Sequence, residues 1–232
     1  MQGVQAAHSH ADRPDAVATE SGGQARKRVL ALHGFAQTGA FFRQKTGSVR
    51  KGMKDVEFVY IDAPFSGTHP TIGEGKSWYE FHEKGEDGRN MEWGKFDETV
   101  KFLEGVFTQQ GPFDGILGFS QGACVAGVLS ALLEHGRLPS GISFSFAVLI
   151  SGFEPRDERY RDICSPQHKI TKVRSLHVIG QADEVVDPSR SLQVADLFQD
   201  PTIVEHDKGH MVPSDKRVRD ALKSFMLADD LH

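Results

Sequence analysis

The stretch that decides the fold is "GPFDGILGFSQGAC", residues 111–124. An apolar segment runs straight into "GFSQG" (118–122), and small and apolar residues follow it. Two glycines that flank a serine permit a sharp turn from strand to helix, because bulkier residues there would collide with the neighbouring elements. Such a turn would lift the hydroxyl of Ser120 out of the sheet as a nucleophile. A plain glycine turn with an incidental serine is the alternative, and the rest of the chain decides between them.

Short apolar runs alternate with longer amphipathic ones from residue 28 onward. The apolar runs are mostly continuous, which is typical of parallel strands covered on both faces. Strands that alternate with helices indicate right-handed crossovers, so the pattern predicts the α/β class with a parallel six-stranded sheet. The predicted strands cover residues 28–34, 56–64, 113–120, 145–152, 173–180 and 201–206. The predicted helices cover residues 40–53, 93–110, 121–135, 188–198 and 214–227.

Length and composition predict one globular domain over residues 27–232, after a flexible N-terminal tail over residues 1–26 that is poor in large apolar residues. The formal net charge of −5 argues against nucleic acid or an anionic membrane as the main partner. No apolar run approaches the roughly 20 residues that span a bilayer. Two cysteines, Cys124 and Cys164, are too few for a disulfide framework, which favours a reducing, cytoplasmic location. The sequence does not indicate an oligomeric state.

A serine nucleophile needs a base, and the base needs an acid to orient it. In strand–nucleophile–helix architectures the chain order is serine, acid, histidine. The segment "DKGHMVP" (207–213) supplies His210 directly after the last predicted strand. "VIGQADEVVDP" (178–188) supplies the acid, for which we favour Asp183. Asp187 is the alternative acid, although its place before a proline is typical of a helix N-cap.

The oxyanion formed in acyl transfer needs two backbone donors, one after the nucleophile and one in the loop after the first strand. The N–H groups of Gln121 and Phe35 are the predicted pair. Two nearby histidines, His33 and His206, are expected to be structural. Cys124, one turn into the predicted helix, is expected to pack in the core.

Residues 63–92 match no regular element, and a loop of that length in a compact domain is usually functional. Because it follows the second strand, we expect it at the carboxyl edge of the sheet as a partial lid. Trp78 and Phe81 are predicted to face an acyl pocket, or alternatively to pin the loop to the body. Other apolar residues expected to bind substrate flank the predicted site, namely Phe41, Phe42 and Met211.

These residues resemble the family of serine hydrolases known as FSH, small α/β-hydrolases that include fungal and animal esterases. The resemblance rests on "LHGFAQTGAFFRQKTGSVRK" (32–51), "GPFDGILGFSQGA" (111–123), "LISGFEP" (149–155), "SLHVIGQADEVV" (175–186) and "GHMVP" (209–213). It implies a three-layer α/β-hydrolase fold and a triad of Ser120, Asp183 and His210. A hydrolase core that lacks its usual first antiparallel hairpin implies the strand order 2-1-3-4-5-6.

The resulting expectation is a serine carboxylesterase for small-molecule acyl esters of medium to long chain, with neither cofactor nor metal. A thioesterase that releases acyl or polyketide acids would use the same triad. A non-catalytic protein that binds a ligand in the same pocket is a second alternative. A fluorophosphonate probe distinguishes the last possibility, because it labels only an activated serine.

Overall fold

Six parallel strands form the central sheet, in the spatial order β2-β1-β7-β8-β9-β10. The computed structural model describes residues 26–84 and 90–228, so residues 1–25 of the predicted tail lie outside it. The class, the strand number and the strand order agree with the prediction from the sequence. The strands are β1 (Lys27–Leu32), β2 (Val56–Tyr60), β7 (Gly115–Phe119), β8 (Phe146–Ile150), β9 (Arg174–Gly180) and β10 (Thr202–His206).

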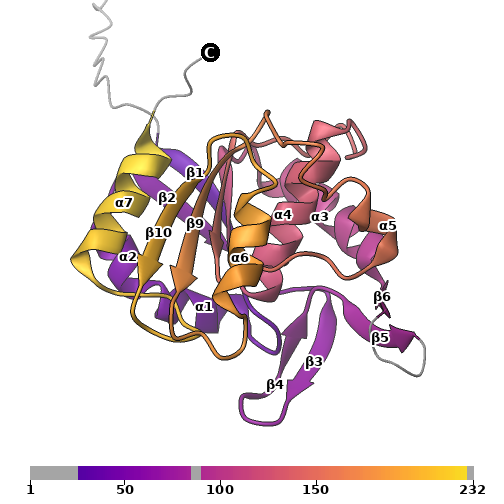
Figure 1. Ribbon diagram of the computed structural model, residues 1–232. Coiled ribbons are helices and arrows are strands. Elements are labelled where there is room, and N and C mark those ends of the chain that lie inside the picture. The colour runs from indigo at the N-terminus through magenta and orange to yellow at the C-terminus, as the bar shows by residue number, and fades with distance from the viewer. Residues whose placement is uncertain (1–25, 85–89, 229–232) are drawn as a thin grey trace, which may run out of the picture.

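Helices cover both faces of this sheet (Figure 1). One face carries α1 (Gly39–Lys45), α2 (Gly47–Lys51) and α7 (Lys216–Leu227). The other carries α3 (Phe96–Gln110), α4 (Gln121–Glu134) and α6 (Pro188–Ala195), and the short α5 (Glu158–Arg161) follows β8 in the chain. The helix predicted over residues 40–53 is divided into α1 and α2, and α3 starts later than expected because β6 ends at Gly94.

The continuous apolar runs supply two cores at once. Ile116 of β7 packs in the core under α3 and α4, while the next residue, Leu117, packs in the core under α1, α2 and α7. Successive strand side chains point to opposite faces, so a strand covered on both sides needs apolar residues at every position. Each of the five residues of β7 and of β8 is buried.

The segment 63–92 departs most from the sequence analysis, because it contains two antiparallel hairpins. They are β3 (Phe65–His69) with β4 (Gly73–Ser77), and β5 (Glu80–Lys84) with β6 (Asn90–Gly94). Figure 1 shows the β3–β4 hairpin beyond the edge of the sheet toward which the arrowheads of β9 and β10 point. A Cβ on Gly75 would overlap the carbonyl oxygen of Ala36, so this hairpin packs directly on the loop after β1.

Within the described residues, no helix is long and apolar enough to cross a membrane. Cys124 is buried, and both it and Cys164 are free thiols. Cys124 therefore packs in the core, as expected. A cytoplasmic location stays a prediction.

Candidate active site

Ser120 lies at the turn between β7 and α4, at the carboxyl edge of the sheet. Its φ of 53° and ψ of −115° place a non-glycine residue in a region that L-residues rarely occupy. The N–H of Ser120 donates to the carbonyl oxygen of Ile150 at 2.9 Å, which ties the turn to β8. Backbone strain of this kind is typical of a nucleophile held on a sharp strand-to-helix turn.

Two glycines allow helix α4 to approach the sheet closely. A Cβ on Gly118 would overlap the carbonyl oxygen of Gly122. A Cβ on Gly122 would overlap the carbonyl oxygen of Leu32 in β1. Both obstacles are backbone atoms, so the helix and the strand would have to move apart. The turn therefore requires glycine at both flanking positions, which is the physical basis of the "GFSQG" pattern.

A chain of two hydrogen bonds joins Ser120 to an acid. Nε2 of His210 lies 3.0 Å from Oγ of Ser120, and Nδ1 of His210 lies 2.8 Å from Oδ2 of Asp183. The histidine follows β10 and the aspartate follows β9, so parallel strands bring all three residues to one edge. When Nδ1 carries its proton toward the carboxylate, Nε2 can accept the proton of the serine.

The carboxylate of Asp183 is buried and accepts several hydrogen bonds. Its Oδ1 accepts the N–H groups of Val185 at 3.0 Å and Val186 at 2.9 Å. Burial by itself raises the pKa of a carboxyl, but the N–H of Val186 and the imidazole of His210 outweigh burial and hold the pKa of Asp183 below its ordinary value. Asp183 is therefore ionised at neutral pH.

Asp187, the alternative acid, caps a helix. Its Oδ1 accepts the backbone N–H of Ser189 at 2.8 Å and the hydroxyl of the same residue at 2.6 Å. It is the N-cap of α6, with Pro188 at the first helical position. This is the arrangement that its place before a proline predicts, and it leaves Asp183 as the acid at His210.

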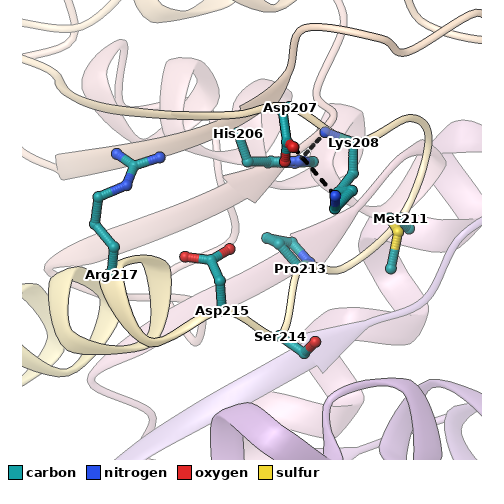
Figure 2. A pocket seen from close by; sticks show the side chains of 8 residues that line it. All are labelled: His206, Asp207, Lys208, Met211, Pro213, Ser214, Asp215 and Arg217. Carbon is teal, nitrogen blue, oxygen red and sulfur yellow. Dashed lines mark hydrogen bonds and ion pairs between the residues drawn. The ribbon is translucent and has the colours of Figure 1, made fainter.

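His206 supports the loop that carries His210. Its side chain is buried, and its Nδ1 accepts the N–H of Lys208 at 3.2 Å. Figure 2 shows His206 among the residues that line another cavity, together with Asp215 and Arg217 at the start of α7. The volume of this cavity is about 450 Å³. Ser120 does not line this cavity. Within the described residues, the buried Nε2 of His206 has no hydrogen-bond partner. A structural role for His206 stays a prediction.

The predicted oxyanion donors lie on two adjoining segments. Phe35 is in the loop after β1, and Gln121 is the first residue of α4. Among the described residues, neither backbone N–H donates a hydrogen bond to another protein group. The helix dipole of α4 adds positive potential at the same place.

His33 holds the first of these segments from inside. Its Nε2 accepts the N–H of Ala63 at 3.0 Å, and its Nδ1 lies 2.7 Å from the carbonyl oxygen of Gly34. Burial lowers the pKa of His33, so the imidazole is neutral and donates through Nδ1. His33 is therefore a buried structural histidine bonded to backbone.

The segment between β4 and β5 fastens both sides of the predicted oxyanion hole. Oε1 of Gln121 accepts the N–H of Trp78 at 3.0 Å, and Nε2 of Gln121 donates to the carbonyl oxygen of Tyr79 at 3.1 Å. The indole N–H of Trp78 donates to the carbonyl oxygen of His33 at 2.8 Å. Sequence reasoning missed this clamp because its partners are 42 to 45 residues apart, and no spacing rule links them.

Two cavities adjoin the Ser120–His210 pair. The first, called the His210 cavity, has a volume of about 260 Å³, and the second, called the Ser120 cavity, about 230 Å³. The His210 cavity is lined by His210 and by apolar side chains that include Phe41, Phe42, Phe119, Met211 and Ile72. The Ser120 cavity is lined by Ser120 and Gln121 together with Phe35, Phe81, Val185 and Val186, among others.

Trp78 lines neither cavity, so the prediction that it faces an acyl pocket is wrong. Its side chain is 0% exposed, and its indole N–H is committed to His33 inside the protein. The alternative interpretation, in which Trp78 pins the segment to the body, describes its position correctly. Phe81 does line the Ser120 cavity and is 42% exposed.

Comparison with known proteins now identifies the family. The model of the family described as serine hydrolase (FSH1) matches residues 23–222. The chain belongs to the FSH1 serine hydrolase family. Esterase C25G4.2 of Caenorhabditis elegans is 33% identical over 212 residues, 88% of this chain and 94% of that protein. Esterase OVCA2 of Xenopus tropicalis is 35% identical over 217 residues, 85% of this chain and 92% of that protein.

Solved structures agree with an α/β-hydrolase fold for this FSH1 family member. Acyl-protein thioesterase 2 of Zea mays matches with a TM-score of 0.61 at 19% identity, over 88% of this chain and 95% of that one. A carboxylesterase from Mesorhizobium loti also has a TM-score of 0.61, at 16% identity, over 90% of this chain and 91% of that one. The resemblance in the sequence is confirmed, and the protein is a serine hydrolase enzyme.

Proposed function

We propose that this serine hydrolase is a carboxylesterase in which Ser120, His210 and Asp183 form the catalytic triad. The observation that carries the proposal is the pair of hydrogen bonds at His210, 3.0 Å to Ser120 and 2.8 Å to Asp183. The names of the esterase relatives agree with this bond type. The strained turn at Ser120 holds the hydroxyl beside His210, in the wall of the Ser120 cavity.

In the proposed mechanism, Nε2 of His210 takes the proton of Ser120 as Oγ attacks the ester carbonyl carbon. The N–H groups of Phe35 and Gln121 stabilise the oxyanion. The imidazolium then donates its proton to the alcohol oxygen as the C–O bond breaks, which leaves an acyl-enzyme. Water, deprotonated by His210, attacks the acyl carbon. The imidazolium then returns this proton to Oγ of Ser120 as the bond between Oγ and the acyl carbon breaks, which releases the carboxylic acid and restores the serine. Asp183 keeps the imidazole in the required tautomer and stabilises its charged form.

The cavities favour apolar substrates of moderate size. Each has a volume below the roughly 300–1,000 Å³ typical of small-molecule sites, and each has several aromatic or aliphatic walls. We therefore place the substrate within the medium- to long-chain range, toward the medium end. A longer chain would have to leave a cavity through its mouth.

Labelling with a fluorophosphonate probe tests the nucleophile. We expect wild-type protein to be labelled at Ser120 and a Ser120→Ala variant to remain unlabelled, although both should have the same melting temperature within a few degrees. An unlabelled wild-type protein would contradict the triad and favour a non-catalytic binding role.

A substrate series tests the bond type. Hydrolysis of p-nitrophenyl esters from acetate to palmitate should be compared with matched acyl-CoA thioesters of the same acyl groups. We expect higher kcat/KM for the esters, with an optimum at medium chain length. A consistent preference for the thioesters would assign the protein to the thioesterases instead, because both reactions use the same residues.

A further inference from the structure

The two cavities are lined by different residues of the candidate active site. His210 lines only the His210 cavity, whereas Ser120 and Gln121 line only the Ser120 cavity. Phe119, which also lines the His210 cavity, packs against His210 with 4.9 Å between the two ring centroids. The part of the substrate that enters each cavity can therefore be inferred from the geometry of the tetrahedral intermediate.

In that intermediate, the former carbonyl carbon bears Oγ of Ser120, the oxyanion, the leaving oxygen and the acyl carbon. The leaving oxygen must lie within hydrogen-bonding reach of Nε2 of His210, because this nitrogen returns the proton. The oxyanion must face the N–H groups of Phe35 and Gln121. Of the two adjoining cavities, the one beside Nε2 of His210 is then next to the leaving oxygen. The acyl group is left with the cavity that Ser120 and both predicted oxyanion donors, Phe35 and Gln121, line.

We propose that the Ser120 cavity binds the acyl group and the His210 cavity binds the leaving alcohol. This assignment rests on the proposed triad. Apolar side chains are the majority in both walls, although Lys45 also lines the His210 cavity and Arg156 and Arg190 also line the Ser120 cavity. The substrate class that follows is esters in which the acid and the alcohol are both largely apolar. Phe41, Phe42 and Met211, which the sequence analysis expected to bind substrate, then contact its alcohol part.

Exposed apolar side chains at the two mouths provide the specificity-determining residues. Phe81 (42% exposed) and Val185 (68%) stand at the Ser120 cavity, and Ile72 (48%) stands at the His210 cavity. These side chains come from separate loops and hairpins. Phe81 also packs on Tyr79 and Phe35, with ring centroids 5.0 and 6.4 Å apart, so the effect of its substitution is measured relative to the shortest ester of each series. A substrate chain that covers one of them should gain up to about fourfold in kcat/KM per buried methylene.

Two substrate series separate the two sides. The acyl series consists of ethyl esters from acetate to decanoate, and the alcohol series consists of acetates from ethyl to decyl, with ethyl acetate shared. Release of acid, measured by titration, gives kcat/KM for the wild type and for Phe81→Ala and Ile72→Ala. Ile203→Ala is the matched control, since Ile203 on β10 is 43% exposed and lines neither cavity.

We expect Phe81→Ala to lose kcat/KM progressively along the acyl series, with an unchanged chain-length dependence along the alcohol series. Ile72→Ala should lose kcat/KM progressively along the alcohol series, with an unchanged chain-length dependence along the acyl series. Ile203→Ala should have the chain-length dependence of the wild type in both series. Val185→Trp, which narrows the Ser120 cavity, should lower kcat/KM for decanoate much more than for acetate, whatever the alcohol.

A crossed pattern, with Phe81→Ala acting on the alcohol series or Ile72→Ala on the acyl series, would overturn the assignment. So would the same fractional loss at every length in both series. The proposed triad would fail differently, through the absence of fluorophosphonate labelling at Ser120. Labelled protein with a crossed pattern would therefore keep the triad and reject only the cavity assignment.

Discussion

The indole N–H of Trp78 donates a hydrogen bond of 2.8 Å to the carbonyl oxygen of His33, two residues before Phe35. The two rings also pack together, with their centroids 5.2 Å apart. Both residues are 0% exposed, so water cannot replace the bond. A buried carbonyl that loses its donor costs about 1–3 kcal/mol. The position of Phe35, and of its N–H, therefore depends on a side chain from the distant connection between β4 and β5.

Trp78→Phe removes the indole N–H and keeps an aromatic ring. We expect kcat for a short ester to fall about tenfold with little change in KM, because oxyanion donors act mainly in the transition state. Steady-state kinetics together with thermal unfolding would measure both consequences.

Phe144→Leu is the control, because Phe144 is buried in the core beside Phe107, at 6.4 Å between ring centroids. This variant should lower the melting temperature and keep kcat. If kcat and melting temperature fell in the same proportion in Trp78→Phe and in Phe144→Leu, Trp78 would act on stability alone.

Substitution of the two aspartates tests the acid. Asp183→Asn should lower kcat by about 10⁴, because an amide favours the wrong tautomer of His210. Asp187→Asn should keep kcat within a few-fold, because asparagine also caps helices. Single-turnover and steady-state rates for both proteins would measure this. The reverse ranking would move the acid to Asp187.

Loss of the nucleophile or the base should be more severe. Ser120→Ala and His210→Ala should each lower kcat by roughly 10⁶. The double variant should be no worse than either single one, because the two groups act as a unit. Additive losses in the double variant would contradict a shared proton transfer.

Substitution of two glycines of α4, Gly122 and Gly127, allows a matched comparison of the free energy of unfolding. Gly122→Ala would place a Cβ against the backbone of Leu32 and His33, and we expect destabilisation of about 1–3 kcal/mol or more, with loss of fluorophosphonate labelling. Gly127→Ala meets only Leu149 at 3.5 Å and Val194 at 3.8 Å. That variant should gain up to about 1 kcal/mol from helix propensity. Urea unfolding measures both values, and equal effects would contradict the close approach at Gly122.

The buried imidazole of His177 predicts a pH dependence of stability. Burial lowers its pKa from 6.5 to about 3. Between these values the unfolded chain binds one more proton than the folded protein, so stability falls as pH falls. The contribution is about 1.4 kcal/mol per pH unit.

His177→Gln cannot titrate, and its amide can still reach the hydroxyl of Ser175, which lies 3.0 Å from Nε2 of His177. The free energy of unfolding of this variant should therefore decline less steeply than that of the wild type between pH 6 and pH 4. His33 and His206, whose pKa values burial also lowers, are present in both proteins and cancel in the comparison. If the free energy of unfolding declined equally with pH in both proteins, His177 would be protonated in the folded protein between pH 6 and pH 4.

Local pattern in the sequence was sufficient for the sheet and for the candidate triad. Six apolar runs separated by amphipathic segments leave a parallel sheet as the arrangement that buries them all. Ser120, Asp183 and His210 each follow directly after a strand, and parallel strands end at one edge. The topology therefore brings the three residues together. Chain order was enough to name Ser120 and His210, whereas the choice between Asp183 and Asp187 followed from their hydrogen bonds in the structure.

The tertiary structure decided what depends on contacts between distant segments. The hairpins of segment 63–92 carry little apolar periodicity and were missed. The β3–β4 hairpin packs on the loop after β1, and β6 contacts the short helix α5, so neither hairpin contributes a strand to the central sheet. The position of Trp78 depends on a hydrogen bond to a carbonyl 45 residues away, which no local pattern reveals. Its aromatic character suggested a pocket residue, whereas in the structure its buried indole holds the segment against the loop after β1. The two cavities are likewise formed by side chains from several loops, whose relative positions follow only from the packed protein.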